Sequence, residues 1–287
     1  MLNKALYLIS LLSFLALTSC ISFSKNNQSI SNFSNISTEL HSCNLANSSY
    51  AFNKKIPGLN PDNIAFLNWN IYKGNGDHWQ DDLSSFATNH HLMTIQEANL
   101  STQMAELLQK NNFGWIMNTA FHSKNIATGV MNIASTHAIY SCGFKVNEPF
   151  IRIPKTALVS YYFIEGSEET LLVANIHGIN FTPGINSYHN QLNNLYNAVK
   201  HHEGPMIIAG DFNSWSDNRM LAVNELVKIL ALSKLEYTVN NKTHIFGKSI
   251  DHVFYRQLTP LKHHVHQVSS SDHNPISVTF KLKFKTL

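Results

Sequence analysis

Short apolar segments of strand length recur along most of the chain, and this recurrence restricts its fold more than any other feature. Between them, Trp79, Leu83 and Phe86 repeat at helical spacing, a longer amphipathic stripe covers 188–199, and a third helix is expected over 219–232. Strands mixed with a few helices and long connections favour sheets with helices outside over regular βαβ alternation. The predicted strands are 64–71, 92–96, 157–164, 171–176, 206–209, 250–255 and 276–284.

The length and charge of the chain are compatible with one large domain. Its 287 residues suffice for a single unit, and a hydrophobic content of 44% can fill a sizeable core. Charged residues make up 14%, below the ~25% that is usual for soluble domains. Because the formal net charge is only +3, binding of nucleic acid would require a local basic groove.

Residues 1–20 have the features of an export signal. Lys4 precedes an apolar run, which is too short for a membrane span and ends in Leu17-Thr18-Ser19-Cys20. This ending resembles a bacterial lipobox, which implies cleavage before Cys20 and lipidation of that cysteine. We therefore expect an exported lipoprotein, anchored to a membrane and located in the outer membrane or periplasm if the host is Gram-negative. An ordinary cleaved signal is the alternative.

The remaining chain divides into two parts. Residues 21–60 are rich in Ser and Asn and predict a flexible tether, followed by one folded domain over 61–287. Cys43 and Cys142 remain once Cys20 is assigned to the lipid. Export would allow these two cysteines to form a disulfide, whereas free buried cysteines are also common.

Polar residues stand where the predicted strands end or begin. A single case would indicate a turn or a cap, but repetition at successive strand ends points to one common site. The residues are Asn70, Glu97, His177, Asp211, Asn213, Asp251, Asp272 and His273.

This set of side chains suits hydrolysis of phosphate esters. Glu97, with Asn70 or Asp272 as a further oxygen ligand, would suit Mg²⁺, which uses one or two carboxylates and keeps several waters. There is no HExxH motif and no CxxC pair to favour zinc. The two histidines can transfer protons and face an anionic oxygen. A metal, a base and cationic donors together favour attack of water on phosphorus.

The motifs that carry these residues resemble the endonuclease/exonuclease/phosphatase superfamily, which includes DNase I and bacterial sphingomyelinases. They are NWNIYKG, IQEA, NIHGIN, GDFNSW, IDHVF and SDHNP, in the order of the family and over 63–284. The motifs are most similar to those of a bacterial subfamily with WNIYK, NIHxINF, GDFNxWS and SDHNP. This similarity implies a fold but no substrate. The resemblance implies an α+β fold, a four-layer αββα sandwich of two mostly antiparallel sheets with helices outside.

The resemblance also implies a metal site and a base. Glu97 would bind Mg²⁺, with Mn²⁺ as a possible substitute, and Asn70 and Asp272 would help to hold the metal or its water. Asp211 would orient or deprotonate the attacking water.

Four further residues would act on the phosphate. Asn213 and His177 would hold phosphate oxygens as charge develops. His273 would face the scissile phosphate and stay protonated beside Asp251, because a nearby carboxylate favours the charged imidazole.

Some of these residues have simpler explanations. Asn70 could cap a turn, Asp251 could merely begin a strand, and His177 could be a core histidine. The histidines at 263, 264 and 266 are expected to be solvated and are left outside the metal site. Several family members have a mid-chain Arg or Tyr on the phosphate, for which the candidates are Tyr72, Lys73 and Arg152.

Three functions follow from the sequence. The first is a Mg²⁺-dependent phosphodiesterase, expected to be a monomeric nuclease that acts outside the cytoplasm. The second is a phospholipid or sphingolipid phosphodiesterase or phosphatase, for which an exposed apolar loop would be expected. The third is a binding lipoprotein that has lost the chemistry, which the complete set of site residues argues against.

Overall fold

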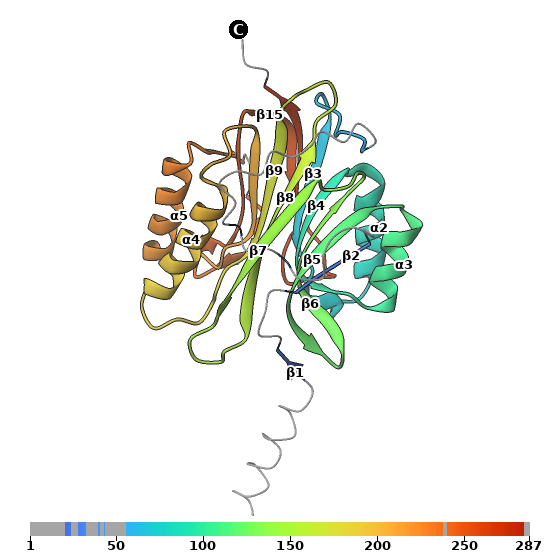
Figure 1. Ribbon diagram of the computed structural model, residues 1–287. Coiled ribbons are helices and arrows are strands. Elements are labelled where there is room, and N and C mark those ends of the chain that lie inside the picture. Colours follow the sequence, from blue (N-terminus) through green and yellow to red (C-terminus); the bar gives the residue numbers. More distant parts are fainter. Residues whose placement is uncertain are drawn as a thin grey trace, which may run out of the picture.

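The computed structural model of the chain describes residues 21–23, 28–32, 40, 43, 56–237 and 240–283. Two β-sheets pack face to face, and helices cover the outer face of each sheet (Figure 1). Helices α4 and α5 lie on one side of the molecule, and α2 and α3 lie on the other. The predicted four-layer αββα arrangement is confirmed.

The first sheet has the order β1-β5-β6-β4-β3-β16-β15, with β2 also paired to β5. Only β3 and β4 are parallel neighbours in it, and the other pairs are antiparallel. Its elements and outer helices are β1 (Ile21–Ser22), β2 (Gln28–Ser31), β3 (Ile64–Asn70), η1 (Tyr72–Gly74), α2 (Trp79–Asn89), β4 (Leu92–Asn99), α3 (Thr102–Lys110), β5 (Gly114–Ser123), β6 (Ile126–Ala134), β15 (Leu258–Val265) and β16 (Ile276–Leu282).

The second sheet has the order β11-β14-β10-β9-β8-β7, in which β9 and β10 are the parallel pair. A separate short hairpin, β12–β13, precedes β14. The elements are β7 (Tyr140–Asn147), β8 (Pro154–Phe163), β9 (Thr170–His177), α4 (Asn186–Val199), β10 (Met206–Asp211), α5 (Asp217–Ile229), β11 (Ser233–Lys234), β12 (His244–Ile245), β13 (Lys248–Ser249) and β14 (Asp251–Arg256).

Helices α3 and α5 begin at serine caps, and the outer helices bury apolar residues against the sheets. Ser101 accepts a hydrogen bond from the backbone of Met104 at the start of α3, and Ser216 caps α5 in the same way. In α4, the predicted stripe of Tyr188, Leu192 and Leu195 is buried against the second sheet. The expected helical segments therefore form, and their buried faces fix the outer layers.

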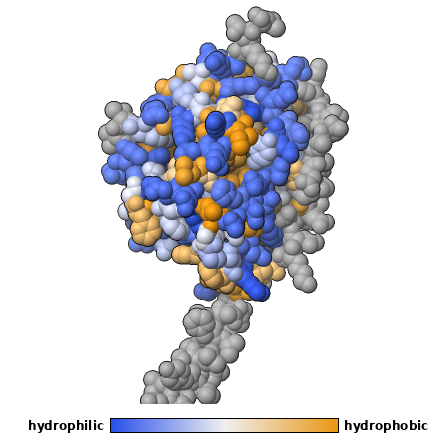
Figure 2. All heavy atoms as spheres, turned by 90° about the vertical axis from the view of Figure 1, so that its left-hand side faces the viewer, coloured by the Kyte–Doolittle hydropathy of each residue, from blue (hydrophilic) through white to orange (hydrophobic). Residues whose placement is uncertain are grey.

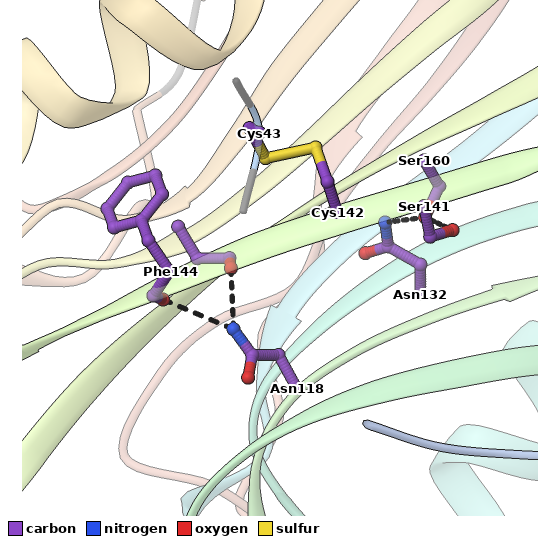
Figure 3. The surroundings of a disulfide bond; sticks show 8 residues. Cys43, Asn118, Asn132, Ser141, Cys142, Phe144 and Ser160 are labelled. Atoms are coloured by element: carbon purple, nitrogen blue, oxygen red, sulfur yellow. Dashed lines mark hydrogen bonds between the residues drawn. A yellow bond between two sulfur atoms is a disulfide. The ribbon is translucent and has the colours of Figure 1, made fainter. Parts of the chain in front are cut away.

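A layer of buried amides joins the two sheets. Asn175 of β9 donates hydrogen bonds to the carbonyls of Ile95 (3.2 Å) and Met131 (3.0 Å) and accepts one from Gln96 (2.7 Å). Asn118 of β5 likewise donates across to β7 and β8, as Figure 3 shows in part. Unpaired buried amides are unfavourable, so these bonds fix how the sheets sit against each other.

The described part of 21–60 differs from the expected flexible tether. Strands β1 and β2 pair with β5, Leu40 is buried, and Cys43 forms a disulfide with Cys142, 99 residues further along the chain (Figure 3). Edge strands pair through their backbones, so they need no apolar periodicity in the sequence. The predicted signal peptide and Cys20 lie outside the described residues. No described helix is both long and apolar enough to cross a bilayer.

Candidate active site

Asp211 is the centre of a group of buried polar side chains at the end of β10. Its carboxylate accepts hydrogen bonds from Asn70 Nδ2 (3.1 Å) and from the backbone amide of Asn213 (2.9 Å). Gly210 precedes it with a φ of +150°, and a Cβ atom there would lie 1.9 Å from the carbonyl oxygen of Ile176. Glycine is therefore required in the GDFN motif to bring Asp211 against the end of β9.

Glu97 reaches the site through an irregularity in β4. The register between β4 and β6 shifts between Ile95 and Ala98, and Glu97 has a φ of +51°. Such bulges re-aim a side chain, and left-handed backbone is concentrated at functional sites. The Glu97 carboxylate pairs with the ammonium of Lys73 and lies 3.8 Å from His177 Nε2.

Asp251 and His273 form a buried pair next to Asp211. His273 Nδ1 lies 2.8 Å from Asp251 Oδ2, while His273 Nε2 lies 3.9 Å from Asp211 Oδ2. Burial alone would lower the pKa of His273, but the charge and hydrogen bond of Asp251 outweigh it and raise the pKa to about 10. His273 is thus an imidazolium at neutral pH that presents Nε2–H towards Asp211, and its contact with the scissile phosphate stays a prediction.

His177 has the opposite electrostatic character. Burial, followed by the nearby Lys155, lowers the pKa of His177 well below its ordinary value. The ammonium of Lys155 lies 2.7 Å from His177 Nε2, so the lysine donates and the neutral ring accepts. Burial also lowers the pKa of Lys155, but the charges of Glu97 and Asp211 oppose this and favour its ammonium form, which His177 positions.

The electrostatics of Asp211 favour a role as a base. Burial, opposed by the charge of His273 and reinforced by that of Asp251, raises the pKa of Asp211 to about 6. A carboxylate with a pKa near the working pH is ionised and still able to accept a proton.

The predicted residues come together to different degrees. Asn213 donates its side-chain amide to the Gly178 carbonyl (2.9 Å). The Asn70 amide oxygen accepts from the backbone of Tyr72 (3.1 Å), so this residue both caps a turn and contacts Asp211. Asp272 lies at the mouth of the site, with its side chain 57% exposed and Oδ1 4.0 Å from His273 Nε2.

Lys155 is the site residue that the sequence reasoning missed. It stands at the start of β8, which runs antiparallel to β9 and therefore begins where β9 ends. The predicted site residues at strand ends were carboxylates, amides and histidines, and the available signal for Lys155 was its place at the beginning of a buried strand. Among the predicted candidates for a cation, Lys73 contacts Glu97, whereas Tyr72 and Arg152 are exposed.

The donor set fits a divalent cation. Among the described residues, Asp211 and Asp251 offer carboxylate oxygens that lie within 4.8 Å of each other, whereas the adjacent His273 is protonated and offers no lone pair to a cation. Asp251 Oδ1 is buried without a hydrogen-bond partner, and Glu97 presents a partly exposed carboxylate to the same cavity as His177. Carboxylate oxygens are the ligands of hard cations, so these residues could hold one. The histidines at 263, 264 and 266 belong to a different groove beside α2.

The ends of the two packed sheets hold a buried base, an imidazolium, a lysine and carboxylates. This combination is typical of hydrolases that act on phosphate esters. The chain belongs to the endonuclease/exonuclease/phosphatase family, whose model matches residues 67–273. The matched range includes every predicted site residue of the domain.

Curated relatives share most of the domain. A UPF0294 protein of Vibrio campbellii is 41% identical over 219 residues, which cover 75% of this chain and 77% of the relative. A UPF0294 protein of Klebsiella pneumoniae is 35% identical over 224 residues, covering 78% and 84%.

Solved structures share the fold. The catalytic domain of human Nocturnin with bound sulfate has a TM-score of 0.61 at 16% identity, covering 79% of this chain and 97% of that one. The mannosyl-6-phosphatase of Bacteroides thetaiotaomicron has a TM-score of 0.59 at 14% identity, covering 76% and 99%.

Proposed function

We propose that the protein is a Mg²⁺-dependent phosphodiesterase in which Asp211 directs water at phosphorus. The observation that carries this proposal is the position of Asp211. It is buried, and its Oδ2 atom lies 3.9 Å from Nε2 of the His273 imidazolium and 3.5 Å from Nε2 of His177, which positions Lys155. The base therefore lies near two cations, His273 and Lys155, that can contact a phosphate.

The metal would be held by carboxylates, with Glu97 the first candidate and Asp251 Oδ1 an available oxygen. When bound, it would withdraw charge from the phosphate and lower the barrier to attack. The ammonium of Lys73 pairs with the Glu97 carboxylate and compensates its negative charge in the cavity. Mn²⁺ is the expected substitute.

The residues of the chain perform the remaining work. Asp211 orients water and takes its proton as the water oxygen forms a bond to phosphorus. The bond from phosphorus to the leaving oxygen breaks, and that oxygen takes up a proton to leave as an alcohol. His273 and Lys155 donate hydrogen bonds where negative charge develops, which is usually the largest contribution to such catalysis.

The sequence predicts nucleic acid as the substrate, with lipid phosphodiesters as the alternative. Human Nocturnin and the mannosyl-6-phosphatase share the fold, and the latter's name describes a phosphatase. The phosphate is common to all these substrates, so the roles above apply to each of them. The chain is further expected to be exported and anchored through Cys20, at the outer membrane of a Gram-negative host.

The test is hydrolysis of bis(p-nitrophenyl) phosphate and nicking of plasmid DNA by the full chain with Mg²⁺. We expect hydrolysis of the diester that EDTA abolishes and that Asp211→Asn reduces at least about 100-fold. Asp217→Asn, an exposed aspartate at the start of α5, is the matched control and should keep full activity. A folded protein that hydrolyses neither substrate with Mg²⁺ or Mn²⁺ would refute the proposal and revive the binding-only alternative.

A further inference from the structure

Three site residues, Glu97, Lys155 and His177, line a cavity of about 240 Å³. Six apolar residues also line it and form its apolar wall: Ala120, Phe121, Ile151, Ile153, Pro154 and Phe181. Polar residues, among them Thr128 and Asn180, complete the lining. A phosphate held at Lys155 would therefore place the group esterified to it close to hydrocarbon side chains.

The apolar wall continues outward as an exposed rim. Phe150 is 68% exposed, Ile151 is 52% exposed and Phe181 is 60% exposed. Single exposed apolar residues are ordinary, but several around the mouth of one cavity indicate a surface that binds something apolar. Figure 2 shows hydrophobic residues at the lower end of the molecule, where the β7–β8 turn lies in Figure 1.

Buried charged groups hold this rim in place. Glu148 is fully buried, and its carboxylate accepts hydrogen bonds from the backbone amides of Asn180 (2.5 Å) and Phe181 (2.9 Å). The buried guanidinium of Arg219 donates to the carbonyls of Ile179 and Asn180, both at 2.7 Å. The segment that presents Phe181 is therefore fixed to the β7–β8 turn, and these hydrogen bonds hold the rim in one conformation.

The N-terminal end of the described chain lies beside the same cavity. Ile21 pairs with Ser123, and the ring of Phe23, 51% exposed, lies 6.5 Å from that of Phe121, which lines the cavity. In Figure 1, β1 lies at the same end of the molecule as the β5–β6 and β7–β8 turns. Ile21 directly follows the cysteine predicted to carry the lipid, so an anchor there would hold the mouth of the site near a membrane.

We propose that the cavity and its rim bind the apolar chain of an amphiphilic phosphate ester, taken from a lipid surface. This inference rests on the proposed function, because it assigns the substrate class of the same site. A nucleic acid would need cations along the rim for its flanking phosphates. The exposed side chains of Phe150, Ile151 and Phe181 are apolar, and the one cation beside them in the β7–β8 turn, Arg152, suffices for a single anionic headgroup but not for a row of phosphates.

The test is a series of alkyl p-nitrophenyl phosphates with ethyl, butyl, hexyl and octyl groups, hydrolysed by the full chain below their aggregation concentrations. Each further methylene group buried in an apolar site should raise kcat/KM by at most about fourfold. We expect kcat/KM to rise at least about tenfold from the ethyl to the hexyl ester. The double variant Ile151→Ser with Phe181→Ser should reduce this ratio. Ile229→Ser, equally exposed on α5 at 64%, should not.

A second arm distinguishes the macromolecular substrates. Vesicles of phosphatidylethanolamine and phosphatidylglycerol should release soluble phosphorus compounds, with little nicking of plasmid DNA at the same enzyme concentration. Hydrolysis of all four esters with no dependence on chain length would overturn the inference and leave the proposed function intact. Nicking of DNA without hydrolysis of vesicles would do the same. Failure to hydrolyse any ester would overturn both.

Discussion

Replacing Asp251 with asparagine should remove the charge of His273 at mildly alkaline pH. In the native protein Asp251 raises the pKa of His273 to about 10, against the effect of burial. Asparagine keeps the shape and can accept a hydrogen bond, but it carries no charge. Burial is then opposed only by the charges of Asp211 and Asp272, and we expect the His273 pKa in Asp251→Asn to fall to about 6.5.

The size of the effect follows from these pKa values. At pH 8 the protonated fraction of His273 should fall from about 99% to about 3%, roughly a 30-fold loss of the imidazolium. At pH 6 the same change leaves most of the histidine charged, so the loss from this cause is below about twofold. The ratio of kcat/KM between native protein and variant should therefore grow with pH between 6 and 8.

The assays are a pH profile of kcat/KM and an NMR titration of the His273 ring. The stability that the pair contributes is complete below pH 6.5 and is lost as the pH rises through about 10. The Tm difference between native protein and variant should therefore shrink at alkaline pH. Asp62→Asn, which removes a surface partner of Lys281, should change neither profile. A loss of activity that is equal at pH 6 and pH 8, or a His273 that stays charged in the variant, would refute the reasoning.

Three further predictions concern the cation, the inter-sheet amides and the disulfide. Lys155→Met should lower kcat about 100-fold with the fold intact, as circular dichroism would show, because it removes a donor to the developing charge. Asn175→Leu should lower the free energy of unfolding, measured in urea, by about 3 kcal/mol. The Gln96 amide and the carbonyls of Ile95 and Met131 would lose their hydrogen bonds to Asn175. Cys43→Ser with Cys142→Ser should lower it by about 3 to 5 kcal/mol, because the bridge closes a long loop; an unchanged urea midpoint would contradict this.

Most strands that the sequence predicted bury apolar residues on both faces, whereas β16 was visible through alternation of buried and less buried residues. Strands β3, β9 and β10 consist almost entirely of buried residues, so their apolar runs were visible. Strands β5 and β6 were missed because Asn118 and Asn132 interrupt them, and these amides are buried in the layer between the sheets. Such core strands cannot be recognised from their own sequence, because each buried amide needs a hydrogen-bond partner from the opposite sheet.

The site was predictable where residues lie at the carboxyl ends of strands. Asp211, His177 and Asn70 follow this rule and come together as expected. Lys155 does not, because it begins an antiparallel strand whose register only the fold establishes. The apolar rim was also missed, since Phe150 and Phe181 lie in turns and have no periodicity that would mark them as a surface.

The central claim is that Asp211 directs water to attack phosphorus, and hydrolysis in ¹⁸O-enriched water tests it most directly. Hexyl p-nitrophenyl phosphate would be hydrolysed by the native protein and by Asp211→Asn, and both products analysed by mass spectrometry. The account predicts one ¹⁸O atom in the hexyl phosphate, none in the nitrophenol, and a rate at least about 100-fold lower for the variant. Label in the nitrophenol, or an equal rate in Asp211→Asn, would contradict it.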